Sequence, residues 1–388
     1  MAVVHDELLA WREEFPLARQ ATHLIAHSLG AMPRRARTKL AQYLDQWDTR
    51  GIRSWEDAWW TLPLTVGDIL ADILHAPHGS VTMHPNVTLA QAIVLSAIDF
   101  QGGRDRLVCT ALDFPSLLYL YDGLADRGAR VTRVPSDDGL TIDAQKVADA
   151  IDERTAVVAL SAVLFKSAAI VDLAPVIAKA HKVGAPVLLD AYQWIGAIPL
   201  DVTALGADFV TGGSVKYLCG GPGAAWLYVR KDLIEQFAPR VTGWFGNESP
   251  FAFTMPDQSY AESIWRFMGG TPAVASLYQA RAGHTLIGEI GVRRIREKSL
   301  VMTQNCIDWV DELGMKLNTP RAPELRGGAI VFDFASAADV CRELNRRKFF
   351  CDHRPTAGIR IAPHFYTKPE EIELLFTELK KIRSGSGR

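Results

Sequence analysis

LLDAYQWIGAIPLDVTALGADFVTGGSVKYLCGGPGAAWLY, residues 188–228, holds both a sheet pattern and a chemical one. An apolar run ends at Asp190, and a second short strand pattern, residues 207–211, leads to Lys216 and a glycine cluster. An acid at one strand end and a lysine after the next strand is the arrangement that pyridoxal 5'-phosphate (PLP) chemistry requires. The lysine carries the cofactor as a Schiff base, and the acid keeps the pyridine nitrogen protonated. The alternative is structural, with Asp190 as a helix N-cap and Lys216 as a surface lysine.

Strand and helix patterns alternate through the middle of the chain. We expect strands at residues 80–83, 106–110, 130–134, 156–160, 186–190, 207–211 and 225–229, and helices at 87–98, 115–127 and 173–183. Such alternation predicts an α/β fold with a mostly parallel sheet and helices on both faces. Ligands of such folds bind at the carboxyl ends of the strands. Asp190 and Lys216 both fall at or just beyond such ends.

The pattern changes near Gly283, where we expect a smaller α+β domain. It begins with a long helix at 286–313 and continues with strands at 329–334, near 349 and at 358–362, and helices at 337–346 and 369–383. The first fifty residues read as helical with one loop. The predicted units are an N-terminal arm and helix that joins the small domain (1–55), a large PLP-binding α/β domain (56–282) and the small C-terminal domain (283–388).

Composition argues against several kinds of partner. The charge is nearly balanced, with 42 Lys and Arg against 44 Asp and Glu, so no nucleic-acid or membrane partner is expected. No apolar run reaches the roughly 18 residues of a membrane-spanning helix, and the acidic, amphipathic N-terminus is not typical of a signal peptide. The five cysteines are scattered without CxxC spacing, which predicts reduced thiols in a cytoplasmic protein and no metal site.

Several further motifs carry a resemblance to a known family. They are HSLGAMP at 27–33, GIRSW at 51–55, DFPS at 113–116, KYLCGGPG at 216–223, GWFG at 243–246, GTP at 270–272, DHRP at 352–355 and GIR at 358–360. Along most of its length the chain is similar to fold-type I PLP enzymes of the class V aminotransferase group, and it resembles kynureninase among them. The resemblance implies a mostly parallel seven-stranded sheet between helices, PLP as cofactor, an amino acid as small-molecule substrate, and a homodimer with shared active sites.

The cofactor-binding candidates come partly from simple chemistry and partly from this resemblance. Asn86, Val87 and Thr88 open the helix after the first strand, where backbone N–H groups suit a phosphate. By resemblance, Phe114 stacks on the cofactor ring and Gln193 donates to its phenolic oxygen. The alternative for Phe114 is ordinary core packing at a strand-to-helix junction.

Other candidates concern the neighbouring subunit and the substrate. By resemblance, Trp244 and Thr271 reach the phosphate of the second subunit of a dimer. Ser28 lies in a predicted substrate-binding segment, and Arg360 holds the α-carboxylate of the substrate in a bidentate fork. The alternatives are a packing role for Trp244 and a solvated arginine at position 360.

Three departures from the kynureninase pattern bear on the reaction. Val215 stands where those enzymes place a tyrosine that binds phosphate and donates a proton, and Gln193 stands where they place a histidine. His84 occupies a phosphate-side serine position, where it faces the cofactor or substrate or is a buried structural histidine. These changes predict that PLP is bound and that L-kynurenine is a poor substrate.

Four functions remain open from the sequence. The first is kynureninase-like hydrolytic Cβ–Cγ cleavage or related β-lyase chemistry. The others are an aminotransferase, a cysteine desulfurase or C–S lyase, and a PLP-binding protein without turnover. A desulfurase needs a mobile acceptor cysteine, whereas Cys351 reads as a packing residue and Cys219 lies where the family has asparagine.

Overall fold

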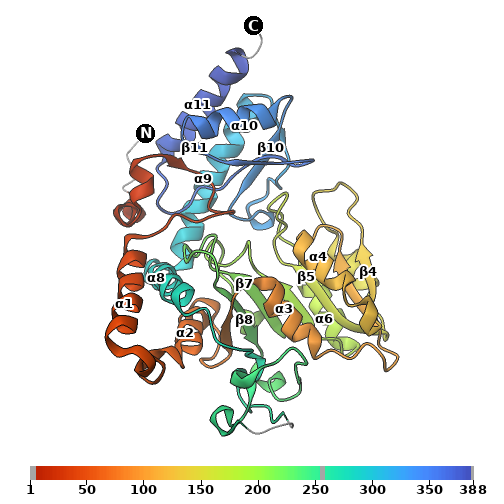
Figure 1. Ribbon diagram of the computed structural model, residues 1–388. Helices are drawn as coiled ribbons and strands as arrows, with labels where there is room; N and C mark the ends of the chain where they lie inside the picture. Colours follow the sequence, from red (N-terminus) through yellow and green to blue (C-terminus); the bar gives the residue numbers. More distant parts are fainter. Residues whose placement is uncertain (1–5, 254–257, 386–388) are drawn as a thin grey trace.

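The computed structural model describes residues 6–253 and 258–385. Its central sheet has seven strands in the order β2-β8-β7-β6-β5-β3-β4. Their bounds are β2 (Val81–His84), β3 (Arg106–Thr110), β4 (Arg130–Val134), β5 (Thr155–Ser161), β6 (Val187–Asp190), β7 (Phe209–Gly213) and β8 (Ala225–Val229). Among these strands only β8 runs against the others. The predicted α/β fold with a mostly parallel seven-stranded sheet is confirmed (Figure 1).

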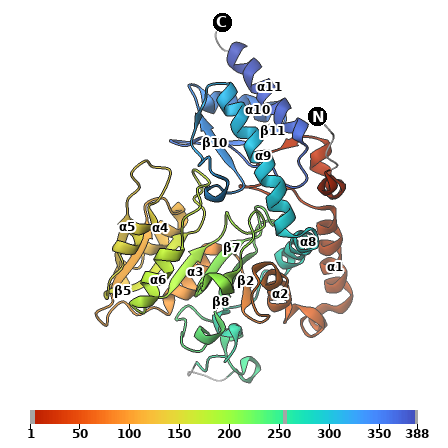
Figure 2. The same ribbon diagram turned by 180° about the vertical axis from the view of Figure 1, so that it is seen from behind.

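Helices cover both faces of this sheet, as the two opposite views in Figure 1 and Figure 2 show. One hydrophobic core joins it to α2 (Leu62–Leu74), α5 (Ala144–Asp149), α6 (Ala174–Lys182), α7 (Val202–Leu205) and α8 (Val274–Ile290). A second core joins it to α3 (Val87–Ser96) and α4 (Pro115–Asp122). Leu189 of β6 belongs to the first core and Leu188 to the second. Because side chains alternate across a strand, a strand buried on both faces reads as a continuous apolar run.

The C-terminal part of the chain has a sheet and a core of its own. The sheet order is β12-β13-β10-β9, with bounds β9 (Lys316–Leu317), β10 (Ile330–Asp333), β12 (Asp352–Arg354) and β13 (Gly358–Ile361). This core also includes residues of three helices, α9 (Val292–Glu312), α10 (Ala337–Arg346) and α11 (Pro369–Gly385).

The N-terminal segment connects the two parts. Its β1 (Thr22–His23) pairs in parallel with β11 (Phe349–Phe350), and α1 (Arg34–Arg50) packs against α8. Figure 1 shows this segment, in red, beside the blue C-terminal elements. The divisions expected at residues 55 and 282 stay a prediction.

One predicted helix is interrupted in the structure, and another ends earlier than expected. The helix expected at 286–313 is wrong as a single element, because α8 ends at Ile290 and α9 begins after Gly291. Gly291 has a φ of 86°, in the left-handed region that favours glycine, and this conformation interrupts the helix. The helix expected at 115–127 ends at Asp122 and is followed by a 3-10 turn, Ala125–Arg127. None of the described helices is long and apolar enough to cross a membrane.

Candidate active site

Asp190 and Lys216 lie at the same edge of the sheet. β6 ends at Asp190 and β7 ends at Gly213, shortly before Lys216, and the two strands are parallel neighbours. Asp190 is 6 % exposed, and its Oδ1 accepts a hydrogen bond of 2.9 Å from the N–H of Tyr192. Turns rather than a helix follow Asp190, so it is not a helix N-cap. Lys216 is half-buried rather than a surface lysine.

Burial changes the charge balance of this pair. It lowers the pKa of the Lys216 amine, although the nearby Asp190 carboxylate opposes the change. It raises the pKa of Asp190, with Asp113 adding repulsion. Asp113 is itself buried and accepts hydrogen bonds from the N–H groups of Thr110 at 2.7 Å and Ser161 at 2.6 Å. Lys216 therefore becomes a neutral nucleophile more readily than an ordinary lysine, which is the condition for attack on an aldehyde.

Two aromatic rings flank the Lys216 amine. Its Nζ lies 4.3 Å from the ring centroid of Tyr192 and 5.9 Å from that of Phe114. Phe114 is 40 % exposed and meets Phe165 edge-on at 5.2 Å, so it is not an ordinary core residue. Sequence reasoning missed Tyr192. Its position just beyond the strand end at Asp190 is a signal, but position alone does not say where the ring points.

The first turn of α3 presents backbone donors. Asn86 is the N-cap, and its Oδ1 accepts a hydrogen bond of 2.9 Å from the N–H of Leu89. The N–H groups of Val87 and Thr88 have no partner inside the helix, as is general for a first helical turn. Such groups, with the positive end of the helix dipole, favour a phosphate. The phosphate contact of residues 86–88 stays a prediction.

His84 and Thr271 line a shared cavity of about 270 Å³ beside α3. The Nε2 of His84 is buried and has no hydrogen-bond partner among the described residues. Burial lowers the pKa of His84 to about 4, so its ring is neutral at neutral pH. The contact of Thr271 with a phosphate stays a prediction.

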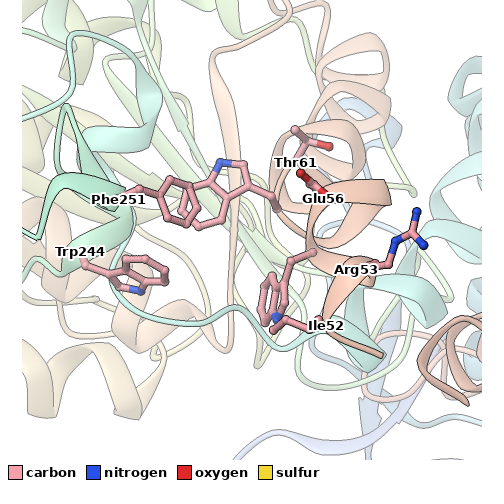
Figure 3. Close-up of a pocket in the computed structure, with 8 residues that line it drawn as sticks. Ile52, Arg53, Glu56, Thr61, Trp244 and Phe251 are labelled. Atoms are coloured by element: carbon pink, nitrogen blue, oxygen red, sulfur yellow. The ribbon is translucent and has the colours of Figure 1, made fainter. Parts of the chain in front are cut away.

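Trp244 lies at a larger cavity of about 710 Å³ (Figure 3). Figure 3 shows Trp244 and Phe251 on one side of this cavity and Ile52 on the other. Trp244 is 38 % exposed and Phe251 64 % exposed. The ring of Trp60, which follows the GIRSW motif in the sequence, meets the ring of Trp244 edge-on with 5.4 Å between their centroids. Trp244 therefore belongs to an exposed aromatic cluster, and its contact with a phosphate stays a prediction.

Arg360 is buried, with 3 % exposure, so it is not a solvated arginine. Its Nε donates to Asp352 Oδ1 at 2.8 Å, its Nη2 to Asp352 Oδ2 at 2.6 Å, and its Nη1 to the carbonyl oxygen of Phe165 at 2.6 Å. A guanidinium has five N–H donors, so each terminal nitrogen keeps one N–H that no described residue accepts. Asp352 thus fixes one edge of Arg360, and each of its two terminal nitrogens retains one N–H that a carboxylate ligand could accept.

The HSLGAMP loop contacts both the Asp352 carboxylate that pairs with Arg360 and the segment that carries Lys216. His27 Nε2 lies 3.1 Å from Asp352 Oδ1, and the backbone oxygen of His27 accepts a hydrogen bond of 3.1 Å from Gln193 Nε2. The N–H of Gly30 donates to the Val215 oxygen at 2.8 Å, which places the loop directly on the Lys216 segment. Burial lowers the pKa of His27 to about 4 despite its bond to Asp352. Ser28 is half-buried in this loop, and its predicted contact with the substrate stays a prediction.

The cysteines do not form a second reactive centre. All five are buried and free. Burial raises the pKa of Cys219, and the Cys351 thiol lies 3.6 Å from that of Cys341 in the small-domain core. No cluster of potential metal ligands occurs in residues 6–253 and 258–385.

These residues fit PLP. Lys216 offers an amine of lowered pKa, Asp190 a buried carboxyl for a pyridine nitrogen, and Phe114 an exposed aromatic face. The first turn of α3 offers donors for the phosphate. Gln193, by contrast, already donates one hydrogen bond to the His27 oxygen, so its predicted bond to the cofactor requires its second amide hydrogen or a rotation.

Comparisons with known proteins agree with this geometry. A sequence profile described as aminotransferase class-V matches residues 32–351. The chain is 30 % identical to a protein named kynureninase from Bacillus cereus, across 97 % of this chain and 92 % of that protein. It is 29 % identical to the uncharacterized aminotransferase YcbU of Bacillus subtilis, across 95 % and 96 % of the two chains.

Solved structures share the fold. An apo cysteine desulfurase from Thermococcus onnurineus NA1 has a TM-score of 0.86 at 21 % identity, covering 97 % of this chain and 98 % of its own. A C-DES variant with glycine covalently linked to its PLP cofactor has a TM-score of 0.86 at 20 % identity, covering 95 % of this chain and 98 % of its own.

Proposed function

Because the chain belongs to the aminotransferase class-V family, we propose that this PLP-dependent enzyme cleaves an amino acid at its β-carbon. The proposed reaction is kynureninase-like hydrolysis of the Cβ–Cγ bond or a related β-lyase reaction. The main support for this function is that Arg360 is buried and that each of its terminal nitrogens keeps an N–H for a carboxylate. Every α-amino acid presents such a carboxylate. The relative named kynureninase supports the β-carbon chemistry, since its similarity spans nearly the whole chain.

Each residue of the site has a distinct task in this proposal. PLP supplies an electron sink for negative charge that develops beside the amino group of the substrate. Lys216 would hold the cofactor aldehyde covalently and, once displaced by the substrate amine, would take the proton from the α-carbon. Asp190, as a carboxylate, would hold a proton at the pyridine nitrogen. Arg360 would bind the α-carboxylate and so orient the bond to be broken.

Val215 favours a second candidate function within the same chemistry. Its isopropyl group can neither bind phosphate nor donate a proton, so β-cleavage of kynurenine loses a group that the resemblance assigns to it. An aminotransferase or a C–S lyase needs no proton donor at that position. The similarity to the protein named aminotransferase YcbU is consistent with this second candidate. A desulfurase has less support, because Cys351 is 3 % exposed and packs against Cys341.

We further propose a homodimer in which each active site takes residues from both subunits. Support comes from the exposed aromatic surface formed by Trp244, Phe251 and Phe253, of which Phe253 is 70 % exposed. Surfaces of this kind are typical of protein interfaces. Trp244 and Thr271 would then reach the phosphate of the partner rather than that of their own chain. A cytoplasmic location is part of the proposal and is supported by the five free cysteines.

The testing experiment is an amino-acid panel with the PLP-loaded protein and mass-spectrometric detection of alanine, keto acid or sulfide. The panel includes L-kynurenine and 3-hydroxykynurenine, with anthranilate fluorescence as a second readout. We expect β-cleavage of some amino acid, and L-kynurenine turnover about a hundredfold to ten-thousandfold below an ordinary rate, the usual effect of losing a proton donor.

Each other result has a definite meaning. Turnover of L-kynurenine at roughly ten per second would show that Val215 does not impair the reaction. Keto acid formed with turnover only when 2-oxoglutarate is added as amino acceptor, together with glutamate and without alanine or sulfide, would establish the aminotransferase. No product from any amino acid, with no change of the cofactor spectrum, would identify a PLP-binding protein without turnover. Arg360→Lys, which keeps the charge and loses the fork, is the matched control for carboxylate recognition.

A further inference from the structure

We propose that two buried histidines, His284 and His364, are positioning residues that hold the two ends of the lysine segment, residues 214–217, and so fix where the Lys216 amine stands. The inference rests on the proposed role of Lys216 as the residue that holds PLP, and it adds two residues to that site. Each histidine acts through a residue close to Lys216 in the chain, to which its ring makes a contact of 2.8 Å.

The first end of the lysine segment is held by α8. The Nε2 of His284 lies 2.8 Å from Ser214 Oγ, and both residues are fully buried. The backbone of α8 passes directly against the residues that follow, because a Cβ atom placed on Gly283 would lie 2.3 Å from the oxygen of Leu218. The Nδ1 of His284 has no hydrogen-bond partner among the described residues, so the His284 ring serves Ser214 alone.

The second end is held from the C-terminal part of the chain. His364 follows β13 and is buried, and its Nε2 lies 2.8 Å from the backbone oxygen of Tyr217. A carbonyl oxygen only accepts hydrogen bonds, so Nε2 of His364 carries a hydrogen and donates it. The His364 ring also meets the Tyr217 ring edge-on, with 5.5 Å between their centroids. The N–H of His364 donates to Thr367 Oγ1 at 3.0 Å, which fixes its own backbone.

Between these ends the backbone is also fixed. The N–H of Gly30 donates to the Val215 oxygen at 2.8 Å, and the N–H of Cys219 donates to the Lys216 oxygen at 3.0 Å. The main chain on both sides of Lys216 is therefore held, and the amine keeps only the freedom of its own side chain. A nucleophile held in this way reacts faster, because less positional freedom has to be lost when it attacks.

Neutral rings suit this task better than charged ones. Burial lowers the pKa of His284 and that of His364 to about 3, so both rings are neutral at neutral pH. A cation beside the segment would lower the pKa of the Lys216 amine further and would compete with the pyridine nitrogen for the Asp190 carboxylate. The two histidines therefore supply hydrogen bonds and leave the charge balance of the site to Lys216 and Asp190.

A purely structural role is the rival explanation. Loss of a buried hydrogen bond destabilises a protein wherever it occurs, and a loosened site would bind PLP less tightly whether or not the lysine is present. The positioning role instead predicts a defect that depends on the Lys216 amine. The two explanations therefore differ in a Lys216→Ala background, where PLP binds without a covalent bond to this residue.

The experiment measures two quantities after PLP is added to the cofactor-free protein. The first is the rate at which an adduct that borohydride traps forms at Lys216, located by peptide mass spectrometry. The second is the affinity for PLP in the Lys216→Ala background, by equilibrium dialysis. We expect His364→Leu and Ser214→Ala each to slow adduct formation by roughly tenfold to a hundredfold, the effect of a displacement of up to about 1 Å. Neither change should alter the affinity in the Lys216→Ala background.

Three controls keep the result decisive. His364→Gln keeps an N–H donor and should recover most of the rate. Asn318→Leu is the matched control, because Asn318 is buried and its Nδ2 donates to the Ala357 oxygen at 2.7 Å, outside the lysine segment; it should change neither quantity. Far-UV circular dichroism checks that each variant folds, and His364→Met replaces His364→Leu if the latter does not fold.

Several results would overturn the proposal. They are an unchanged rate in His364→Leu or in Ser214→Ala, a rate in His364→Gln as low as in His364→Leu, and an adduct at a lysine other than Lys216. An equal loss of PLP affinity in the Lys216→Ala background would assign the histidines a structural role and also overturn it. A wild type that forms the adduct and converts no amino acid would refute the proposed function and leave this result intact.

Discussion

Asp352→Ala should destabilise the protein far more than removal of an exposed ion pair. The Asp352 carboxylate accepts two hydrogen bonds from Arg360, lies 3.1 Å from His27 Nε2, and forms a further ion pair with Arg354 at 3.0 Å. Its removal leaves the Arg360 guanidinium buried without a counter-ion. Breaking a buried pair in this way typically costs about 3–5 kcal/mol. Because the Asp352 side chain is 14 % exposed, we expect the lower end, about 3 kcal/mol of unfolding free energy.

The assay is urea unfolding followed by tryptophan fluorescence, with Asp311→Ala as the matched control. Asp311 also pairs with an arginine through two hydrogen bonds, of 2.7 and 2.8 Å to Arg321, but these side chains are 47 % and 61 % exposed. Exposed pairs contribute about 0–1 kcal/mol. Equal losses in the two variants would refute the reasoning, because they would mean that burial of Arg360 carries no penalty.

The pH dependence of this contribution to the free energy of unfolding follows from the ionisation of Asp352. Burial opposes its ionisation, but hydrogen bonds from His27 and Arg360 outweigh burial and hold the pKa of Asp352 below its ordinary range. Its contribution is therefore fully present above the ordinary carboxyl pKa and is lost only as the pH falls through the lowered value. Unfolding at pH 7 to 8 measures the whole effect. Added acetate should stabilise Asp352→Ala more than Asp311→Ala, because the freed edge of Arg360 accepts a carboxylate.

Three other predictions concern the cofactor, acid stability and assembly. Lys216→Ala should fold without forming an adduct that borohydride traps, and Asp190→Ala should weaken PLP and abolish turnover; a trapped adduct at another lysine would contradict the first assignment. Thr271→Val should loosen PLP in the dimer, whereas a fully active monomer by analytical ultracentrifugation would contradict shared sites. Five buried histidines have pKa values lowered by burial to between about 3 and about 4: His23, His27, His84, His284 and His364. Between pH 6.5 and 4 the unfolded chain binds more protons than the folded protein. The free energy of unfolding should therefore decrease as the pH is lowered, by up to about 1.4 kcal/mol per pH unit for each histidine. Circular dichroism should show unfolding near pH 5, and a native spectrum at pH 4 would disprove this.

The central sheet was predictable because most of its strands, the edge strand β4 excepted, are buried along their length. Such strands appear as short apolar runs, and the run that ends at Asp190 identifies both the strand and the position of the acid. The position of Lys216 near Asp190 could also be predicted, because neighbouring parallel strands bring their carboxyl ends to the same edge of the sheet. The burial of Arg360 follows from the apolar residues on either side of it.

Other features depend on contacts between distant parts of the chain, and no local pattern encodes them. The direction of the Tyr192 ring depends on the glycine at 213, on a different strand. The pairing of Asp352 with His27 requires the N-terminal loop to reach the small domain. The break at Gly291 escaped prediction because the apolar periodicity continues across it, and one glycine within such a pattern does not by itself end a helix.

The contact between His27 and Asp352 has a consequence for biosynthesis. The two residues lie 325 positions apart, and a ribosome adds roughly 5–20 residues per second. Residue 352 is therefore made tens of seconds after residue 27. During that interval the strands of the central sheet are all synthesised and can pair, while the N-terminal loop has no small domain to join. Within one chain, the residues of the carboxylate pocket around Arg360 are thus synthesised after the lysine and the acid that serve the cofactor.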